Sequence, residues 1–321
     1  MSVQASPARV RDFLSRDERA AFVVASDRVA WLQVAANLGL VGGAFALAGF
    51  IPHPVTAIVA TLVLGGRYVG LGILNHDAAH NALFATRWLN RAMGRWVFSG
   101  PTLLDFDTYR RGHLAHHKDS GTREDPDLPF VRAYPVSRAS MRRKLTRDLS
   151  GRTGLRDSLF LLAMSIRHAR APSLVAHAVM LGALWAAGIG WTYALWWLAL
   201  IFVVPVCLRV RVMGEHGNVP NLLSADARDH ARTTHAGWLA RTFIAPNYVN
   251  YHCEHHFFAS VPGHKLPALH RLLVERGFYD AHPKARSPGY LSVVRACVGD
   301  RADRPDLGDV GRGKASLANM A

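Results

Sequence analysis

The sequence is short of cysteine and of acidic residues, and each shortage excludes a class of protein. It has three cysteines, Cys207, Cys253 and Cys297, whose spacing matches neither a zinc site nor a redox motif. We therefore expect no disulfide framework, which is compatible with a reducing cytoplasm. Asp and Glu number 23 against 38 Lys and Arg, so the formal net charge is +15. No nucleic-acid-binding motif or aromatic stacking pattern accompanies this charge, so we expect no nucleic acid partner.

Half of the 321 residues are hydrophobic, which is a high share for a soluble protein of this charge and fits a membrane protein with a basic cytoplasmic face. Near the N-terminus there is no short apolar run with a cleavage site, so no signal peptide is expected. About 20 apolar residues span a bilayer as a helix. Four segments approach that length, at residues 30–50, 55–74, 173–189 and 191–208. We predict an all-α integral membrane protein whose four transmembrane helices form two hairpins.

Lys and Arg are missing from both hairpin turns. Of the 38 basic residues, 5 lie before residue 30, 17 in 75–172 and 15 in 209–321. The positive-inside rule therefore places both termini and the long middle loop in the cytoplasm. Arg67 is the one basic residue within a span. We expect its side chain to extend to the inner membrane boundary or, alternatively, to bind a substrate head group.

Three histidine motifs follow the spans on this same predicted side. Residues three and four apart lie on one face of a helix, so each motif would present its imidazoles together. Imidazole is the commonest metal-binding side chain, and eight are too many for one tetrahedral zinc. We therefore predict two metal ions on a cytoplasmic helical cap. The motif histidines are His76 and His80, then His113, His116 and His117, and then His252, His255 and His256.

Further candidate ligands lie near these motifs in the sequence. His216 directly follows the fourth span and is the favoured ninth ligand, with His235 as the next candidate. Asn247 and Asn250 could hold a metal through water, and Cys253 is interpreted as a small filler. His264 and His270 have no ligand spacing and are interpreted as surface residues. The acids that could orient histidine rings, or simply face solvent, are Asp119, Glu124, Asp125 and Asp127.

The remaining segments complete the expected organisation. We expect residues 1–29 to form a cytoplasmic N-terminal segment with an amphipathic helix from Arg9 to Phe22. Residues 30–280 are expected to form the membrane domain, and residues 281–321 a partly disordered tail. Two further helices are expected to lie in the membrane interface, at Arg87–Phe98 and Leu155–Ile166. The first of these could instead cover a soluble core.

The HxxxH, HxxHH and HxxHH motifs, separated by two hydrophobic hairpins, resemble those of the membrane-bound fatty acid desaturase and hydroxylase superfamily. The run from His252 to His270, HCEHHFFASVPGHKLPALH, is similar to the third-motif region of bacterial acyl-lipid desaturases. Gly-Glu-His216 resembles the position of their extra histidine. The resemblance covers roughly residues 30–280, and it is strongest to a bacterial group that includes dihydrorhizobitoxine desaturase-like proteins. Carotenoid ketolases and hydroxylases share similar motifs.

This resemblance implies two non-haem irons held by the eight motif histidines and His216, with dioxygen as co-substrate. It implies an oxygen-dependent desaturase that introduces a double bond into a fatty acyl or lipid-like chain, in the bacterial inner membrane. The alternative is a hydroxylase or ketolase acting on a carotenoid or another amphiphile. The chain lacks a His-Pro-Gly-Gly haem motif, so a separate ferredoxin- or cytochrome-type donor with its reductase would supply electrons. No catalytic side chain beyond the metal ligands is predicted.

Two other classes fit the motifs less well. An intramembrane zinc protease needs Glu within HExxH, where this chain has Asp77, and it would leave both HxxHH motifs unused. A metal transporter would carry its ligands within the spans.

Overall fold

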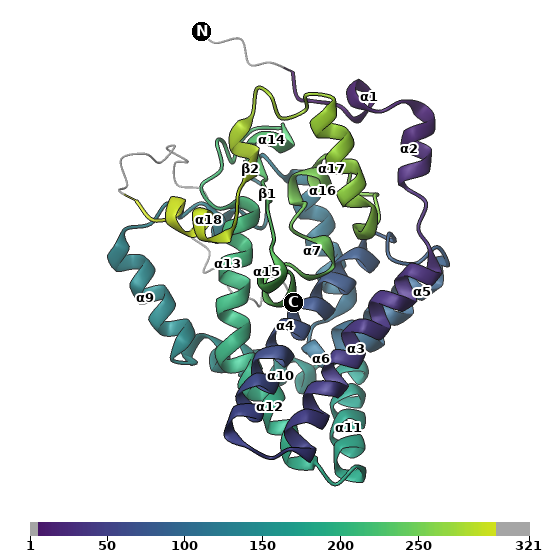
Figure 1. Cartoon of the computed structure of the whole chain (residues 1–321), viewed down its shortest axis with the longest axis vertical. Helices are drawn as coiled ribbons and strands as arrows, with labels where there is room; N and C mark the ends of the chain where they lie inside the picture. Colours follow the sequence, from purple (N-terminus) through teal and green to yellow (C-terminus); the bar gives the residue numbers. More distant parts are fainter. Residues whose placement is uncertain (1–5, 300–321) are drawn as a thin grey trace.

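The computed structural model describes residues 6–299. These residues are mostly helical, and their two strands form a short parallel pair. Long apolar helices form a bundle at one end, and short helices and loops form a cap at the other (Figure 1). The strands are β1 (Thr233–Thr234) and β2 (Arg286–Ser287).

The bundle consists of two helical hairpins whose turns lie at the same end of the molecule (Figure 1). Ser26 caps the first helix by accepting a hydrogen bond from the Val29 N–H, and Pro54 begins the second, where its missing N–H costs nothing. The segment Gly190–His216 is helical throughout, with a π-helical stretch in its middle. The bundle elements are α3 (Asp27–Phe50), α4 (Pro54–Ala79), α11 (Ala171–Ala186), η2 (Gly190–Thr192), α12 (Tyr193–Leu198), η3 (Ala199–Val203) and α13 (Val204–His216).

Three of the described helices are long and apolar enough to cross a membrane: α3, α4 and the Gly190–His216 segment. The predicted span at 173–189 is α11, whose 16 residues rise about 24 Å, less than the roughly 30 Å hydrocarbon core. The prediction of four spans is therefore not confirmed. Large apolar side chains such as Leu32, Ile58 and Val179 are at least 60% exposed on these helices, as expected for a surface that meets lipid.

The cap contains most of the remaining elements. Those before the second hairpin are α1 (Val10–Phe13), α2 (Arg16–Phe22), α5 (Arg87–Met93), η1 (Gly94–Phe98), α6 (Ser99–Thr102), α7 (Phe106–Asp119), α8 (Leu128–Val131), α9 (Arg138–Leu149) and α10 (Arg152–Arg167). Those after it are α14 (Ala227–His230), α15 (Trp238–Phe243), η4 (Pro246–Tyr248), α16 (His252–Phe257), η5 (Gly263–Lys265), α17 (Leu266–Glu275), η6 (Pro283–Ala285) and α18 (Tyr290–Ala296).

The N-terminal segment differs from the single amphipathic helix that we expected. It breaks into α1 and α2 at Leu14, which is 2% exposed and packs in a cluster with Phe278, and Ser15 then caps α2. Glu18 pairs with Arg276 of the cap. The segment therefore lies on the cap because its apolar side chains are buried there. The expected helix Arg87–Phe98 is present, with α5 continuing without a break into the π-helical η1.

The folded chain extends beyond the boundary that we placed at residue 280. β2 pairs with β1, α18 packs against α13, and Cys297 is fully buried in a small apolar cluster. Residues 281–299 therefore belong to the cap rather than to a tail. The disorder expected from Gly299 onward concerns residues 300–321, which lie outside the described part.

A buried polar group joins the bundle to the cap. The Arg67 guanidinium donates to Asn37 Oδ1 of α3 at 3.0 Å and to the backbone carbonyl of Thr242, in α15, at 2.5 Å. Asn247 accepts from Asn37 and donates to the Gly70 carbonyl at 3.0 Å. Arg67 is only 6% exposed, so its side chain does not extend to the membrane boundary as we expected. These contacts hold the 242–247 segment, and the helix that follows it, against α4.

Candidate metal centre

The nine histidines predicted as ligands lie together where the bundle meets the cap. They reach this place from four helical segments that are far apart in the sequence: the last turn of α4 with its C-cap, the second half of α7, the end of α13, and α16. In sequence order they are His76, His80, His113, His116, His117, His216, His252, His255 and His256. The expected convergence of the motifs is therefore present.

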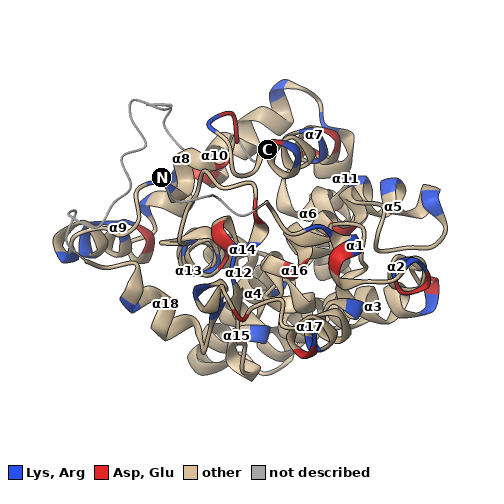
Figure 2. Ribbon diagram, turned by 90° about the horizontal axis from the view of Figure 1, so that it is seen from above, with Lys and Arg blue, Asp and Glu red and all other residues tan. Residues whose placement is uncertain are grey.

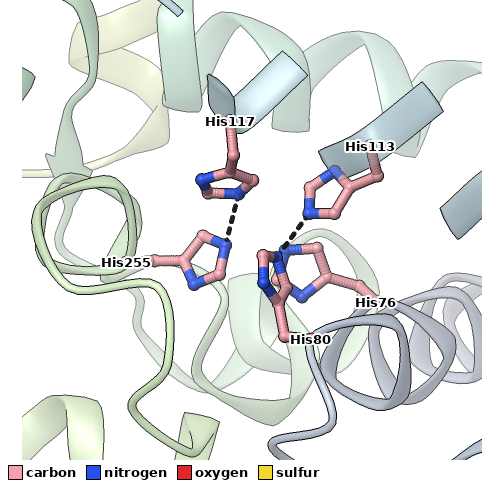
Figure 3. A group of neighbouring side chains, drawn as sticks. All are labelled: His76, His80, His113, His117 and His255. Carbon is pink, nitrogen blue, oxygen red and sulfur yellow. Dashed lines mark hydrogen bonds between the residues drawn. The ribbon is translucent and has the colours of Figure 1, made fainter. Parts of the chain in front are cut away.

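Five of these imidazoles form one group, which we call cluster A. Each offers a nitrogen within 4.8 Å of the others, and Figure 3 shows the rings turned toward a common centre. The Nε2 atoms of His80 and His113 are 2.8 Å apart, and those of His117 and His255 are 2.9 Å apart. Cluster A comprises His76, His80, His113, His117 and His255.

The other four imidazoles form a second, adjacent group, cluster B. His116, His216 and His256 offer nitrogens within 4.8 Å of one another. His252 joins them, because its Nε2 lies 2.8 Å from that of His216 and 3.1 Å from that of His256. The Nε2 atoms of His116 and His256 are 3.3 Å apart. The structure thus divides the histidines into groups of five and four, next to each other.

Helix geometry explains this division. In α7, His113 and His117 are four residues apart and share cluster A, whereas His116 is rotated by about 100° from His117 and lies in cluster B. In α16 the assignment is reversed, since His255 lies in cluster A. Each HxxHH motif therefore contributes to both clusters, which corrects our expectation that a motif points in one direction.

Hydrogen bonds at Nδ1 orient several rings so that Nε2 faces a cluster. His116 Nδ1 lies 2.8 Å from Asp125 Oδ1, and His216 donates from Nδ1 to the backbone carbonyl of His230 at 2.7 Å. His76 Nδ1 lies 2.9 Å from Asp77 Oδ1. Such bonds fix the tautomer of a metal-binding histidine and raise its basicity. Of the acids predicted for this role, Asp125 fills it directly.

The other predicted acids are less involved. Asp127 lies 3.8 Å from His116 Nδ1, whereas Asp119 pairs with Lys118 and Glu124 is exposed. Burial alone would raise the pKa of Asp125, but the hydrogen bond with His116 holds it below its usual value. The carboxylate is therefore ionised near neutral pH.

Burial keeps the cluster histidines of α7 and α16 neutral, with one exception. It lowers the pKa of His113, His255 and His256 well below the usual value, and the neighbouring imidazoles lower it further. His116 is the exception, because the hydrogen bond with Asp125 and the nearby charges outweigh its burial and raise its pKa. Neutral imidazoles with free lone pairs are the form that binds metal ions.

The donor set fits a pair of metal ions. Two nitrogens about 2.1 Å from one metal are about 3.0–3.4 Å apart at ligand angles of about 90–109°, close to the 2.8–3.3 Å measured between Nε2 atoms here. Among the described residues, His76 Nε2 is buried without a hydrogen-bond partner. A metal ion would satisfy a lone pair left in this way, and nitrogen-rich donors suit iron among several first-row ions.

The alternative ligand candidates lie elsewhere. His235 is exposed and lines a pocket of about 380 Å³ on the cap. The side-chain amide of Asn247 accepts a hydrogen bond from Asn37 and donates one to the Gly70 carbonyl. The side-chain amide of Asn250 donates to the Thr234 carbonyl. The Cys253 thiol is fully buried against the Ala227 carbonyl and belongs to neither cluster, which agrees with its interpretation as a filler.

His270 was wrongly interpreted as a surface residue. It is half-buried, and its Nδ1 contacts the carboxylate of Glu254, which is fully buried in the middle of the third motif. The hydroxyls of Thr233 and Tyr279 donate hydrogen bonds to the same carboxylate. These three contacts anchor α16 from the side opposite the clusters. A histidine 18 positions beyond His252 gives no spacing signal for this role.

Comparison with known proteins agrees with the geometry. Residues 52–288 match the fatty acid desaturase family. A beta-carotene ketolase from Paracoccus sp. strain N81106 is 28% identical to this chain, and the match covers 67% of this chain and 80% of the ketolase. A second beta-carotene ketolase, from Paracoccus sp. strain PC1, is 29% identical, and the match covers 67% of this chain and 79% of that ketolase. An sn-1 acyl-lipid omega-3 desaturase (ferredoxin) from Synechocystis is 28% identical over 32% of this chain and 27% of its own. Since the family match spans well over half of the sequence, the protein belongs to the fatty acid desaturase family of oxidoreductases.

Proposed function

We propose that this protein is a membrane diiron oxidoreductase that uses dioxygen to oxidise unactivated C–H bonds of a long apolar substrate. The observation that carries this proposal is the pair of adjacent clusters, with five and four buried or half-buried imidazoles, at the end of an apolar helical bundle. One tetrahedral zinc site would use only four ligands. Two nitrogen-ligated irons would use all nine.

The nine histidines would hold the ions, four through cluster B and five through cluster A. When bound, two ferrous ions supply the redox chemistry that turns dioxygen into an oxidant for C–H bonds. The chain supplies the rest. Asp125 and the His230 carbonyl orient rings of cluster B, and Glu254 anchors the helix of the third motif. Five of the nine histidines are buried and the other four are half-buried, which limits the access of water to the centre.

Two outcomes of this chemistry are candidates. Desaturation, which we expected from the sequence, removes two hydrogens from an acyl chain. Oxygen insertion forms an alcohol, and a second insertion at the same carbon forms a geminal diol that loses water to give a ketone. The ketolase relatives support oxygen insertion on a carotenoid-like substrate, because they match two thirds of this chain and about 80% of themselves. The desaturase relative matches less than a third of this chain. We therefore place oxygen insertion first and acyl desaturation second.

The proposed topology follows the distribution of charge. Two hairpins, with α11 as a short fourth span, would leave the cap in the cytoplasm of a bacterium. All Lys and Arg of the described residues lie outside the hairpin turns, and Figure 2 shows them distributed over the cap, for instance on α9 and α5. An apolar substrate would enter from the membrane, with the C–H bond to be oxidised placed below the clusters.

One experiment tests the reaction and the site together. The chain is expressed in a host that makes both carotenoids and acyl lipids, and the products are identified by mass spectrometry. We expect a new product that has gained oxygen. A product that has only lost two hydrogens would support desaturation. The absence of any oxidised product in a host that supplies electrons would contradict the proposed function.

Two variants test whether cluster A carries the reaction: His113→Ala and His255→Ala each remove one imidazole from it. We expect both to abolish product and to lower bound iron while the protein still inserts in the membrane. His235→Ala is the control, because that side chain is exposed and outside both clusters. Unchanged turnover in either cluster variant would remove that residue from the site.

Electrons would come from a separate acidic carrier with its reductase. The net charge of +15 and the basic cap could steer such a partner toward the centre. We expect the purified protein to turn over only when a ferredoxin or similar donor is added, and to lose rate as salt concentration rises. Turnover without any reductant would contradict this expectation.

A further inference from the structure

His230 is a tenth imidazole beside the centre, outside the three motifs. It ends the short helix α14 and is 6% exposed. Its backbone carbonyl accepts the Nδ1–H of His216, which ties it directly to cluster B. Its own Nδ1–H donates to the backbone carbonyl of Ser224 at 2.8 Å. Because Nδ1 carries the proton in this hydrogen bond, Nε2 keeps a free lone pair.

The ring geometry of His230 matches that of the cluster B pairs. Its ring centroid lies 5.3 Å from that of His256, with an angle of 81° between the ring planes. For His116 with His256 the values are 5.0 Å and 81°, and for His216 with His256 they are 4.8 Å and 90°. The His230 ring thus faces that of His256 at nearly the same centroid distance and interplanar angle as the rings of His116 and His216 do.

The Nδ1 contacts show the same likeness. His116, His216 and His230 each place Nδ1 against an oxygen acceptor, from Asp125, His230 and Ser224 in turn. This is the arrangement by which metal-binding histidines are oriented.

We propose that His230 is an additional ligand of the metal held by cluster B, which gives that metal five imidazoles, as many as cluster A offers. This inference rests on the proposed function, and it assigns a ligand role to a residue that no spacing pattern marks. The competing explanation is that His230 only anchors the 218–230 loop through Ser224.

Replacement by two different amides separates these roles. In His230→Asn the amide nitrogen takes the place of Nδ1, so the bond to Ser224 is kept and Nε2 is lost. In His230→Gln the amide takes the place of Nε2, so a donor atom toward the metal is kept and the bond to Ser224 is lost. His282→Asn is the matched control, because His282 contacts Asp229, the neighbour of His230, through its own Nδ1 at 3.0 Å.

The full-length chain is loaded with Co²⁺ in detergent, and the bound ions, their affinities and the visible spectrum are measured without any turnover assay. We expect two ions in the wild type. For His230→Asn we expect one ion to bind at least about tenfold more weakly, with a changed spectrum for that ion. His230→Gln should lose less affinity than His230→Asn, and His282→Asn should match the wild type.

Wild-type affinity and spectrum in His230→Asn would overturn the inference and leave the proposed function in place. A wild-type chain that binds fewer than two ions would overturn both. If His230→Asn does not fold, a structure of the cobalt-loaded wild type decides. A distance of about 2.1 Å between cobalt and His230 Nε2 supports the inference, and one beyond about 3.5 Å overturns it.

Discussion

Removal of the Asp125 carboxylate should weaken the binding of one metal and leave the other unchanged. Asp125 Oδ1 lies 2.8 Å from His116 Nδ1, and both side chains are nearly buried, at 11% and 4% exposure. In Asp125→Ala the Nδ1–H of His116 loses its charged acceptor. Ser120 Oγ, 3.5 Å away, and Asp127 Oδ2, 3.8 Å away, remain near Nδ1, but both lie beyond the distance of a good hydrogen bond.

The expected magnitude follows from this bond. A hydrogen bond to a charged group is worth about 1.5–3 kcal/mol, and each 1.4 kcal/mol corresponds to about tenfold in an equilibrium constant. We therefore expect the ion held by cluster B to bind about 10- to 100-fold more weakly, which agrees with the usual effect of such outer contacts. The ion held by cluster A should keep its affinity, because His116 does not belong to that cluster.

Competition with a chromophoric chelator measures both affinities on the purified chain. Asp125→Asn should lie between the wild type and Asp125→Ala, since an amide oxygen can still accept from Nδ1. Asp119→Ala, at the end of α7 just before this loop, is the control, because Asp119 pairs with Lys118 instead of a histidine. Equal weakening of both ions, or an equal loss in Asp119→Ala, would refute the reasoning and point to a general loss of folding.

Two further predictions concern stability. At Gly66 a Cβ would lie 2.5 Å from the Thr242 carbonyl, so Gly66→Ala should push the cap from α4 and lower the free energy of unfolding by about 1–3 kcal/mol. Gly72→Ala, on the same helix with nothing within 4 Å, should be neutral or stabilising in the same thermal unfolding assay, and a matching loss there would contradict the explanation. Burial alone would raise the pKa of Asp226, but hydrogen bonds from Arg228 and the Ala8 N–H hold it at about 2. Because this pKa is lowered on folding, its stabilisation of at most about 2 kcal/mol is present above pH 4 and is lost as the pH falls toward 2. The difference in unfolding temperature between wild type and Asp226→Asn should therefore shrink between pH 5 and pH 3, and a constant difference would show that the charge of Asp226 does not matter.

The parts of the fold that were predictable have a strong local signal. The first two spans are long apolar runs with clear capping residues, and the motif histidines are recognised by their helical spacing. The 173–189 segment was harder, because apolar composition alone does not reveal that the helix ends at Ala186 after 16 residues. Composition also misplaced the end of the folded chain. Residues 281–299 are ordered through pairing with β1 and packing on α13, which are contacts with distant residues.

The division of the centre into clusters of five and four was only partly accessible from the sequence. Two identical HxxHH motifs predict two metals, but they do not show that each helix contributes to both. That result depends on how α7 and α16 are rotated when they face each other. The rotation of α16 is set by Glu254, which is held by Thr233, His270 and Tyr279. None of these partners lies within the motif.

His230 shows most clearly why spacing fails. It lies 14 residues after His216, with no second histidine at helical distance. A buried guanidinium brings the two together, because Arg232 donates to the carbonyls of Gly217 and Asn218 at 2.8 Å and folds the intervening loop back on the end of α13. The carbonyl of His230 can then meet the His216 ring. A side chain that reaches the centre through such a closed loop has no periodic signature, so only the folded chain makes it a candidate ligand.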